Sequence, residues 1–369
     1  MTSSLERRLS FFFPGAPEAS ASAPGRVNLM GEHTDYNGGF VLPMAIPQKT
    51  HVWLRRLSER RVEVFSENAP ARPGVHRYLL GAECRGGSWL DYAQGVTAQL
   101  AAAGHRLEGF AAHIRSDVPL GSGLSSSASL TVALLRALRT LFGLSLNDVA
   151  LPLLAQHIEN EFVGAPVGIM DPMAVHLADD AAALFLDTRT LMFERIPFPD
   201  GADLCVINSG LAHRHADGDY KTRRAECEQA ATLLGVPQLR DVSQDALRAL
   251  DVLPEPLIRR ARHVITENAR VLATVQALKA ARWSEIGTLF RASHVSMRDD
   301  YCVSIPEIDT LVDLANTHPD VWGARLTGGG FGGSIVLLTK SGTARRVGQT
   351  IIESYGTKTG QKATLLVPA

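Results

Sequence analysis

The segment from Asp117 to Ser129, which reads DVPLGSGLSSSAS, contains the residue types that can bind a phosphate group. Gly121 and Gly123 let backbone N–H groups approach an anion without clashes from Cβ atoms. If the serines open a helix, its unpaired N–H groups and partial positive charge form an anion site. The serine hydroxyls could cap that helix, bond phosphate oxygens or bind Mg²⁺. No lysine follows the second glycine, so another group must neutralise a bound phosphate.

A second polar segment, from Pro24 to Gly39, crowds donors and acceptors into a predicted strand and the loop after it. Its polar side chains include Asn28, Glu32, His33, Asp35 and Asn37. Such groups converging in a short loop suit a polyol, because each sugar hydroxyl both donates and accepts a hydrogen bond. A charged surface turn is the alternative. A metal site at His33 is disfavoured, since no second histidine stands at ligand spacing.

Two further segments could complete a site. The sequence GAPVGIMDP ends in Asp171 and Pro172, which predicts that Asp171 caps a helix whose first residue is Pro172. The sequence TGGGFGG, residues 327–333, formally matches the dinucleotide pattern G-x-G-x-x-G. That pattern must open a helix, whereas the SIVLLT that follows is a strand pattern. The two remaining interpretations are a glycine-rich hairpin and a wall packed against the glycine- and serine-rich segment 117–129, which we call the phosphate loop.

The hydrophobic pattern around these segments predicts the elements that must position them. We expect strands over 23–30, 40–46, 52–57, 61–65, 110–115, 183–187, 192–197, 204–208, 323–327, 334–339 and 363–367. We expect helices over 89–103, from 125 onwards, and over 146–162, 255–278, 282–293 and 343–355, with a mainly helical middle from 218 to about 316. This mixture predicts an α+β protein, and 369 residues are enough for two domains, which we place at 1–200 and 201–369.

The composition excludes several classes of function. The net charge of −1 provides no basic field for nucleic acid or anionic membrane, so a small molecule is the expected substrate. No stretch approaches the roughly 18 apolar residues of a membrane span. The four cysteines, 84, 205, 227 and 302, form no C-x-x-C pair, which fits a reducing compartment. We therefore expect a cytoplasmic protein, and a monomer, with no nucleic-acid or membrane partner.

Taken together, these segments resemble those of the galactokinases. That family belongs to the GHMP kinase superfamily, with the homoserine, mevalonate and phosphomevalonate kinases. Three glycine-bearing segments define the superfamily, and this chain has all three, at 24–31, 119–128 and 326–333. The galactokinase branch is marked by GRVNLMGEHTDYNGG at 25–39. Further family-like segments are GIMD at 168–171, YKTRRAEC at 220–227 and SHVSMRDDY at 293–301.

The resemblance implies an N-terminal mixed α/β domain and a C-terminal α+β domain, with the active site between them. It implies phosphorylation of the anomeric C1 hydroxyl of α-D-galactose by ATP with Mg²⁺, giving galactose 1-phosphate and ADP. In family terms Asp171 is the catalytic base and Arg26 its cationic neighbour. The implied sugar-binding residues are Glu32, His33, Asp35, Gly168 and Tyr220. The implied ATP-binding residues are Pro119, Gly121, Ser122, Gly123, Leu124, Ser125, Ser126, Ser127 and Ala128, and the implied Mg²⁺ ligands are Ser126 or Ser127 and Glu159.

In this scheme Mg²⁺, the helix N-terminus and Arg26 supply the positive charge that a lysine would have given. The chain departs from the family pattern at Pro172, where glutamine is usual, and at Thr188, where cysteine is common. Pro172 adjoins Asp171 and could therefore alter the shape of the pocket. Of all the expectations, the identity of the sugar depends most on that shape. The alternatives are a related sugar-1-kinase, acting on N-acetylgalactosamine or L-arabinose, and an inactive galactokinase-like sugar sensor. The sensor is disfavoured because the phosphate loop, Glu159 and Asp171 are intact.

Overall fold

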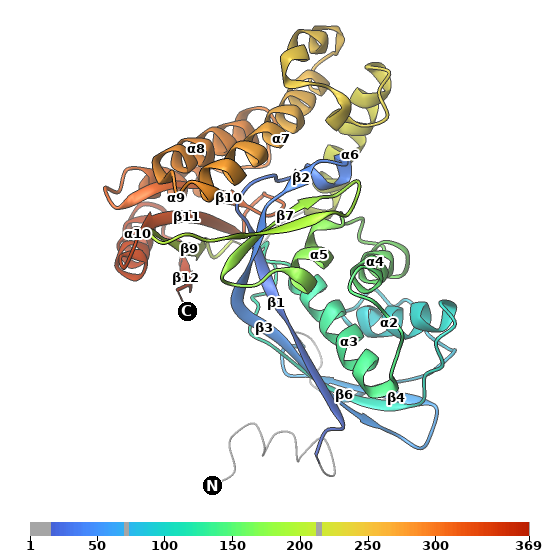
Figure 1. Ribbon diagram of the computed structural model, residues 1–369. Helices are drawn as coiled ribbons and strands as arrows, with labels where there is room; N and C mark the ends of the chain where they lie inside the picture. Colours follow the sequence, from blue (N-terminus) through green and yellow to red (C-terminus); the bar gives the residue numbers. More distant parts are fainter. Residues whose placement is uncertain (1–15, 70–73, 212–215, 369) are drawn as a thin grey trace. The chain divides into compact units, whose positions relative to one another are not determined.

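The computed structural model describes residues 16–69, 74–211 and 216–368. The chain forms two compact units, each built from segments that are discontinuous in sequence (Figure 1). Unit 1 contains the described residues up to Gly25, together with 48–119 and 125–177. Unit 2 contains residues 26–47, 120–124 and the described residues from 178 onwards. The predicted division at residue 200 assumes two continuous segments, and it stays a prediction.

Unit 1 is centred on a five-stranded sheet with the strand order β1-β3-β6-β4-β5. Its strands are β1 (Ala19–Asn28), β3 (Pro43–Arg56), β4 (Arg61–Ser66), β5 (His76–Leu79) and β6 (Phe110–Ser116). Strand β6 pairs antiparallel with β3 and parallel with β4. Val62 and Val64 are buried two residues apart, as the alternation of side chains along a strand requires.

The helices of unit 1 cover one face of that sheet (Figure 1). They are α2 (Leu90–Ala102), α3 (Ser126–Phe142), α4 (Ala150–His157), the π-helical turn η2 (Ile158–Val163) and α5 (Met170–Leu177). Helix α3 buries Val132, Leu135 and Leu138, which recur at helical spacing and form one apolar stripe. This stripe packs with Val52 and Leu54 of β3 in the core of the unit. The opening serines of α3 are thereby attached to a rigid layer.

Unit 2 holds two smaller sheets. The first is antiparallel, with the order β10-β11-β9-β12, and its strands are β9 (Ala202–Asn208), β10 (Val321–Thr327), β11 (Ser334–Lys340) and β12 (Thr364–Val367). The second is formed by β2 (Phe40–Val41), β7 (Ala182–Asp187) and β8 (Phe193–Pro197). The segment 25–39, which we call the sugar-signature segment, precedes β2 and contains the short 3₁₀ helix η1 (Asp35–Asn37).

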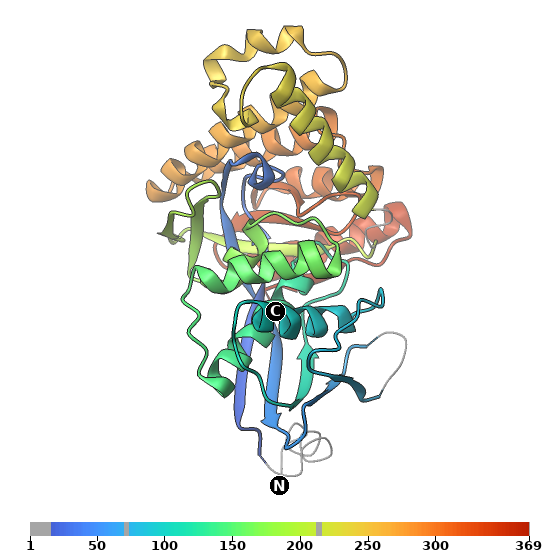
Figure 2. The same cartoon turned by 90° about the vertical axis from the view of Figure 1, so that its right-hand side faces the viewer.

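The remaining elements of unit 2 are helical. They are α6 (Ala216–Leu233), η3 (Leu239–Asp241), η4 (Gln244–Val252), α7 (Leu257–Lys279), α8 (Trp283–Asp299), α9 (Pro306–Asn316) and α10 (Ala344–Thr359). Helices α7 and α8 pack against each other, and α8 also packs on β10 (Figure 1). The segment from α6 to η4, yellow in Figure 2, gathers around α7. Helix α7 therefore connects this segment with the rest of the unit.

The predicted α+β class is confirmed, and nearly every predicted element is present. Two predicted strands, 40–46 and 52–57, are wrong in their bounds, because the chain forms the short β2 and then one long strand, β3. The predicted helix 146–162 is divided into α4 and the π-helical turn η2. Strand β5 was not predicted, since two of its four residues at the sheet edge are exposed, none is buried, and they carry no clear apolar pattern. None of the helices in the described residues is long and apolar enough to cross a membrane.

The contact between α8 and β10 depends on Gly287, because a Cβ atom there would lie 1.9 Å from the carbonyl oxygen of Trp322. We expect Gly287→Ala to lower the free energy of unfolding by roughly 1–3 kcal/mol, since the backbones must move apart. In Gly218→Ala the new methyl group meets no atom of the described residues within 4 Å, apart from its own stretch of helix backbone, so stability should be unchanged or raised by up to about 1 kcal/mol. Urea unfolding of the two variants measures the difference, and equal stabilities would contradict this account of the contact.

Candidate active site

The part of the phosphate loop that belongs to unit 2, residues 120–124, is fixed by backbone-directed contacts. Nη1 of Arg26 donates to the carbonyl oxygen of Gly123 at 2.5 Å, and the N–H of Arg26 donates to the carbonyl of Leu124 at 3.1 Å. The hydroxyl of Ser334 donates to the carbonyl of Ser122 at 2.8 Å. The loop carbonyls are thus turned toward protein donors.

The glycine-rich segment 327–333 packs directly against this loop. A Cβ atom on Gly328 would lie 2.6 Å from the carbonyl oxygen of Gly123, so only glycine allows the observed approach. Strand β11 begins at Ser334, directly after the segment. The dinucleotide interpretation is therefore excluded, and the segment is a wall packed against the phosphate loop.

The serine run continues in unit 1 and opens α3 at Ser126. Ser125 precedes the helix with a φ angle of 60°, in the left-handed region, and its side chain makes no capping bond. Its buried Oγ has no hydrogen-bond partner among the described residues. Ser129 plays a structural part, because its hydroxyl donates to the carbonyl of Ala23 and lies 2.8 Å from Oγ1 of Thr50. Ser126 and Ser127 stand in the first turn, where N–H groups have no partner within the helix.

Glu159, on the π-helical turn η2, is only 1% exposed. Burial, and to a smaller extent the charge of Asp171, raise the pKa of Glu159 to about 8, against a hydrogen bond from Ser127. Its Oε1 has no hydrogen-bond partner within the described residues. A buried carboxylate with an unused oxygen beside a serine hydroxyl is a donor set that suits a hard divalent cation such as Mg²⁺. The described residues contain no group of three or more His, Cys, Asp or Glu side chains that could hold a metal ion, so the protein alone would supply few ligands.

Asp171 lies at the start of α5, but its predicted role as the helix cap is wrong. Helix α5 begins at Met170, and the carbonyl of Ile169 accepts the first helical bond, from the N–H of Met173 at 3.2 Å. Pro172 is consequently the third residue of the helix, which it tolerates because N–H groups of the first turn have no helical acceptor. Asp171 is half-buried, and Gly168, in the loop just before the helix, is buried.

The other end of α5 is tied to α3. Nε of Arg136 donates to Nδ1 of His176 at 3.1 Å, and its Nη2 donates to the carbonyl of His176 at 2.6 Å. Burial, then the charge of Arg136, lower the pKa of His176 to about 4, so the ring is neutral at neutral pH. Nδ1 then accepts, and Nε2 donates to Oδ1 of Asp148 at 3.2 Å. The helices that carry Ser126 and Asp171 are therefore joined by a partly buried contact within one unit.

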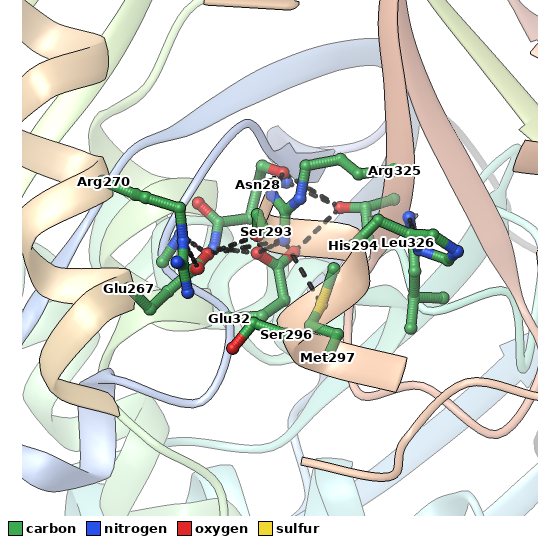
Figure 3. A network of polar contacts seen from close by, with 12 residues as sticks. Asn28, Glu32, Glu267, Arg270, Ser293, His294, Ser296, Met297, Arg325 and Leu326 are labelled. Carbon is green, nitrogen blue, oxygen red and sulfur yellow. Dashed lines mark hydrogen bonds and ion pairs between the residues drawn. The ribbon is translucent and has the colours of Figure 1, made fainter. Parts of the chain in front are cut away.

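In unit 2, Glu32 occupies the centre of a buried polar network (Figure 3). One carboxylate oxygen accepts from Nδ2 of Asn28 at 3.0 Å and from Nη2 of Arg325. The other accepts from the Thr327 hydroxyl at 3.2 Å and from the Gly328 N–H at 3.0 Å. These four donors fill the acceptor positions of the carboxylate. Glu32 therefore joins the sugar-signature segment to the glycine-rich segment, and its predicted contact with a sugar stays a prediction.

A second buried carboxylate, Glu267 of α7, supports the same segment from the other side (Figure 3). Its oxygens accept from the Gly31 N–H at 3.0 Å, from the Ser293 hydroxyl at 2.7 Å and from Nε of Arg270 at 2.6 Å. Against the effect of burial, the charges of Arg270 and Arg325 hold the pKa of Glu267 at about 2. Arg325 and Glu267 were not predicted from the sequence. Arg325 stands as a charged residue within an otherwise apolar strand pattern, whereas Glu267 lies between Thr266 and Asn268 and gives no such signal.

His33 and Tyr220, two of the predicted sugar-binding residues, lie side by side in unit 2, with ring centroids 5.5 Å apart. Nδ1 of His33 lies 2.9 Å from the hydroxyl of Tyr36. Burial, then the neighbouring His263, lower the pKa of His33 to about 3, so the ring is neutral. Asp35 stands at the start of η1 and is half-buried. The rings of His33, Tyr36 and Tyr220 thus form one cluster.

The predicted residues consequently form two groups. Pro119, Ser125 to Ala128, Glu159, Gly168 and Asp171 belong to unit 1, whereas Arg26, Glu32, His33, Asp35, Gly121 to Leu124 and Tyr220 belong to unit 2. Within unit 1 the structure brings Glu159 near Ser127 and Asp171. Within unit 2 it brings Arg26 to the phosphate loop and His33 to Tyr220. The pairing of Arg26 with Asp171 stays a prediction.

Comparison with known proteins identifies the class to which these two groups of residues belong. The family pattern "GHMP kinases N terminal domain" matches residues 91–178, and "GHMP kinases C terminal" matches residues 274–357. The structure superimposes on Methanococcus jannaschii mevalonate kinase with a TM-score of 0.67 at 17% identity, over 95% of this chain and 98% of that one, which shows a shared fold. The protein therefore has the fold of the GHMP kinases.

The narrower family follows from closer similarities. The pattern "Galactokinase galactose-binding signature" matches residues 11–56. The chain is 42% identical to a galactokinase of Chloroflexus aurantiacus over 99% of its length and 95% of that protein. It superimposes on Lactococcus lactis galactokinase complexed with galactose with a TM-score of 0.94 at 33% identity, covering 98% of this chain and 96% of that one. This chain belongs to the galactokinase family.

The raised pKa of Glu159 predicts a pH-dependent loss of stability in the metal-free protein. A carboxyl group whose pKa is higher in the folded state than in the unfolded state destabilises the fold as pH rises between the two values. Glu159→Gln should therefore be more stable than the wild type at pH 8.5, by about 1–4 kcal/mol, with the gain shrinking toward pH 4.5.

Urea unfolding in EDTA at several pH values measures this gain. The matched control is Glu161→Gln, which changes an exposed carboxyl group two residues away and should show no such trend. A gain for Glu159→Gln that is independent of pH would contradict a raised pKa.

Proposed function

We propose that this protein is a galactokinase, which transfers the γ-phosphoryl group of ATP to the C1 hydroxyl of α-D-galactose. The observation that carries this proposal is the intact sugar signature at 25–39 in a chain that belongs to the galactokinase family over almost its whole length. The proposal is also supported by the likeness to a galactokinase that was solved in complex with galactose. The products are galactose 1-phosphate and ADP.

Asp171 is the proposed catalytic base, and Arg26 is its proposed cationic partner. Phosphoryl transfer depends on positioning and on charge neutralisation more than on covalent chemistry. Asp171 takes up or orients the proton of the C1 hydroxyl so that the oxygen can attack the γ-phosphorus. The fixation of Arg26 through Gly123 supports its role, because a guanidinium held beside the phosphate loop is already oriented before the substrate binds.

The nucleotide is proposed to bind along Pro119, Gly121 to Leu124 and Ser125 to Ala128. Phosphate binding there is supported by the first-turn N–H groups of α3 and by the Ser125 hydroxyl, which has no partner in the described part of the chain. We propose Ser126 or Ser127 and Glu159 as the protein ligands of Mg²⁺, because Oε1 of Glu159 has no partner among the residues that the structure describes. When bound, Mg²⁺ neutralises the phosphate charge and takes the place of the absent lysine. Glu159 must lose its proton to serve as a ligand.

The sugar is proposed to bind Asp35, His33, Gly168 and Tyr220. Glu32 fixes the sugar-signature segment through its buried hydrogen bonds. A carboxylate such as Asp35 accepts hydrogen bonds from two sugar hydroxyls and loses one of these bonds when a hydroxyl changes side. We therefore propose selectivity for galactose over its C4 epimer, glucose, by orders of magnitude. The free, scattered cysteines support a cytoplasmic location. The expectation of a monomer stays a prediction.

Release of ADP, measured across a panel of sugars, tests the function. We expect turnover with galactose and rates lower by at least about a hundredfold with glucose, and no release with mevalonate. N-acetylgalactosamine and L-arabinose complete the panel. A higher kcat/KM for either of them would identify a related sugar-1-kinase. No ADP release above the hydrolytic background with any sugar would identify a sugar-binding protein without kinase activity.

Replacement of the proposed base gives a second test. Asp171→Asn should lower kcat by about 10²–10⁴-fold, because an amide cannot take up the proton, while the shape of the side chain is kept. Thermal unfolding should show a stable fold. Asp180→Asn, which changes an exposed carboxylate beyond the end of the same helix, serves as the control with near wild-type kcat. A kcat for Asp171→Asn close to the wild-type value would rule out the assigned role.

A further inference from the structure

The backbone around Asp35 is held by side chains that lie far away in the sequence. Oγ1 of Thr188 lies 2.8 Å from the carbonyl oxygen of Gly39 and 3.1 Å from that of Asp35, and both are acceptors. The N–H of Thr188 also donates to the carbonyl of Gly39, at 3.0 Å. Thr188 is 8% exposed and directly follows β7. A threonine at the end of a strand is thus bound to both ends of the loop that presents Asp35.

Arg240, on η3, holds the same loop at a third carbonyl. Its Nη1 donates to the carbonyl of Gly38 at 2.7 Å. Its guanidinium also forms a two-point ion pair with Asp187, in which Nη2 lies 2.8 Å from Oδ2, and it lies 4.1 Å from the ring centroid of Phe40. Because Asp187 is the last residue of β7, Arg240 and Thr188 both hold the loop from the same end of that strand.

The far end of the loop is fixed by α7. Oδ1 of Asn268 accepts from the N–H of Phe40 at 2.9 Å. The N–H of Gly39 meanwhile donates to the carbonyl of Thr34 at 2.8 Å. The carbonyls of Asp35, Gly38 and Gly39 therefore all have donors from outside the loop. This leaves the backbone that carries the Asp35 side chain with few alternative conformations.

We propose that Thr188 and Arg240 are positioning residues that strengthen binding at the sugar site by fixing the backbone of Asp35. The inference rests on the proposed function, in which Asp35 binds the sugar. Neither side chain needs to touch the substrate. A carboxylate that must accept from two hydroxyls of one ring face tolerates little displacement, so a loosened loop weakens sugar binding while the nucleotide contacts stay intact.

The test uses Thr188→Val, which keeps the shape of the side chain and removes the hydroxyl. We expect the KM for galactose to rise about three- to tenfold, the value of one lost hydrogen bond, with the KM for ATP changed less than twofold. Thr188→Ser keeps the hydroxyl and should restore the wild-type KM. Thr232→Val is the matched control, because within the described residues that hydroxyl bonds only a carbonyl of its own helix, and both KM values should stay unchanged. Arg240→Gln should raise the galactose KM in the same way.

Amide hydrogen exchange without any sugar supplies an independent reading of the loop. In Thr188→Val the amides of Gly39 and Phe40 should exchange about three- to tenfold faster, with exchange in α7 and α8 unchanged. An unchanged galactose KM, or an equal rise in the KM for ATP, would overturn the proposal. Absence of galactose turnover in the wild type would instead overturn the proposed function. The positioning would then be judged by exchange and by the KM of the sugar that the enzyme does accept.

Discussion

The buried contact between Glu32 and Arg325 is the interaction on which unit 2 depends. Both side chains are at most 1% exposed, and Arg325 also donates to the carbonyls of Asn28 and Leu29. Loss of either partner would leave a charge in the core, a change that typically costs several kcal/mol. The network fixes the geometry of three segments that are far apart in the sequence: the sugar signature, α7 through Glu267, and β10.

The phosphate loop shows a different way of fixing a site, through backbone contacts in place of a charged side chain. The packing of Gly328 on Gly123 and the bonds from Arg26 and Ser334 are directed at main-chain atoms. A lysine-free loop needs such support, because its anion-binding strength comes from oriented N–H groups, whose effect depends on direction. Backbone-directed contacts explain why the three glycine-bearing segments occur together in one chain.

The sequence was sufficient for the fold class, for most elements and for the segments that carry the site. Periodicity identifies α3 and β11 because each buries a long apolar pattern, and the glycine segments are visible as composition. It failed where position depends on tertiary contacts. The start of α5 was misplaced because proline is acceptable anywhere in a first turn. Arg325, Glu267, Thr188 and Arg240 were missed because each acts on backbone or charge that only folding brings near.

The contact between Arg136 and His176 has a consequence for how the two helices of unit 1 can move. The guanidinium of Arg136 donates to both the ring and the carbonyl of His176. These two bonds oppose both sliding of α5 along α3 and rotation of α5 about its own axis. The carboxylate of Asp171 and the hydroxyls of Ser126 and Ser127 are then carried by two helices that are fixed to each other. Thermal motion displaces them together, so their spacing is kept while the protein as a whole fluctuates.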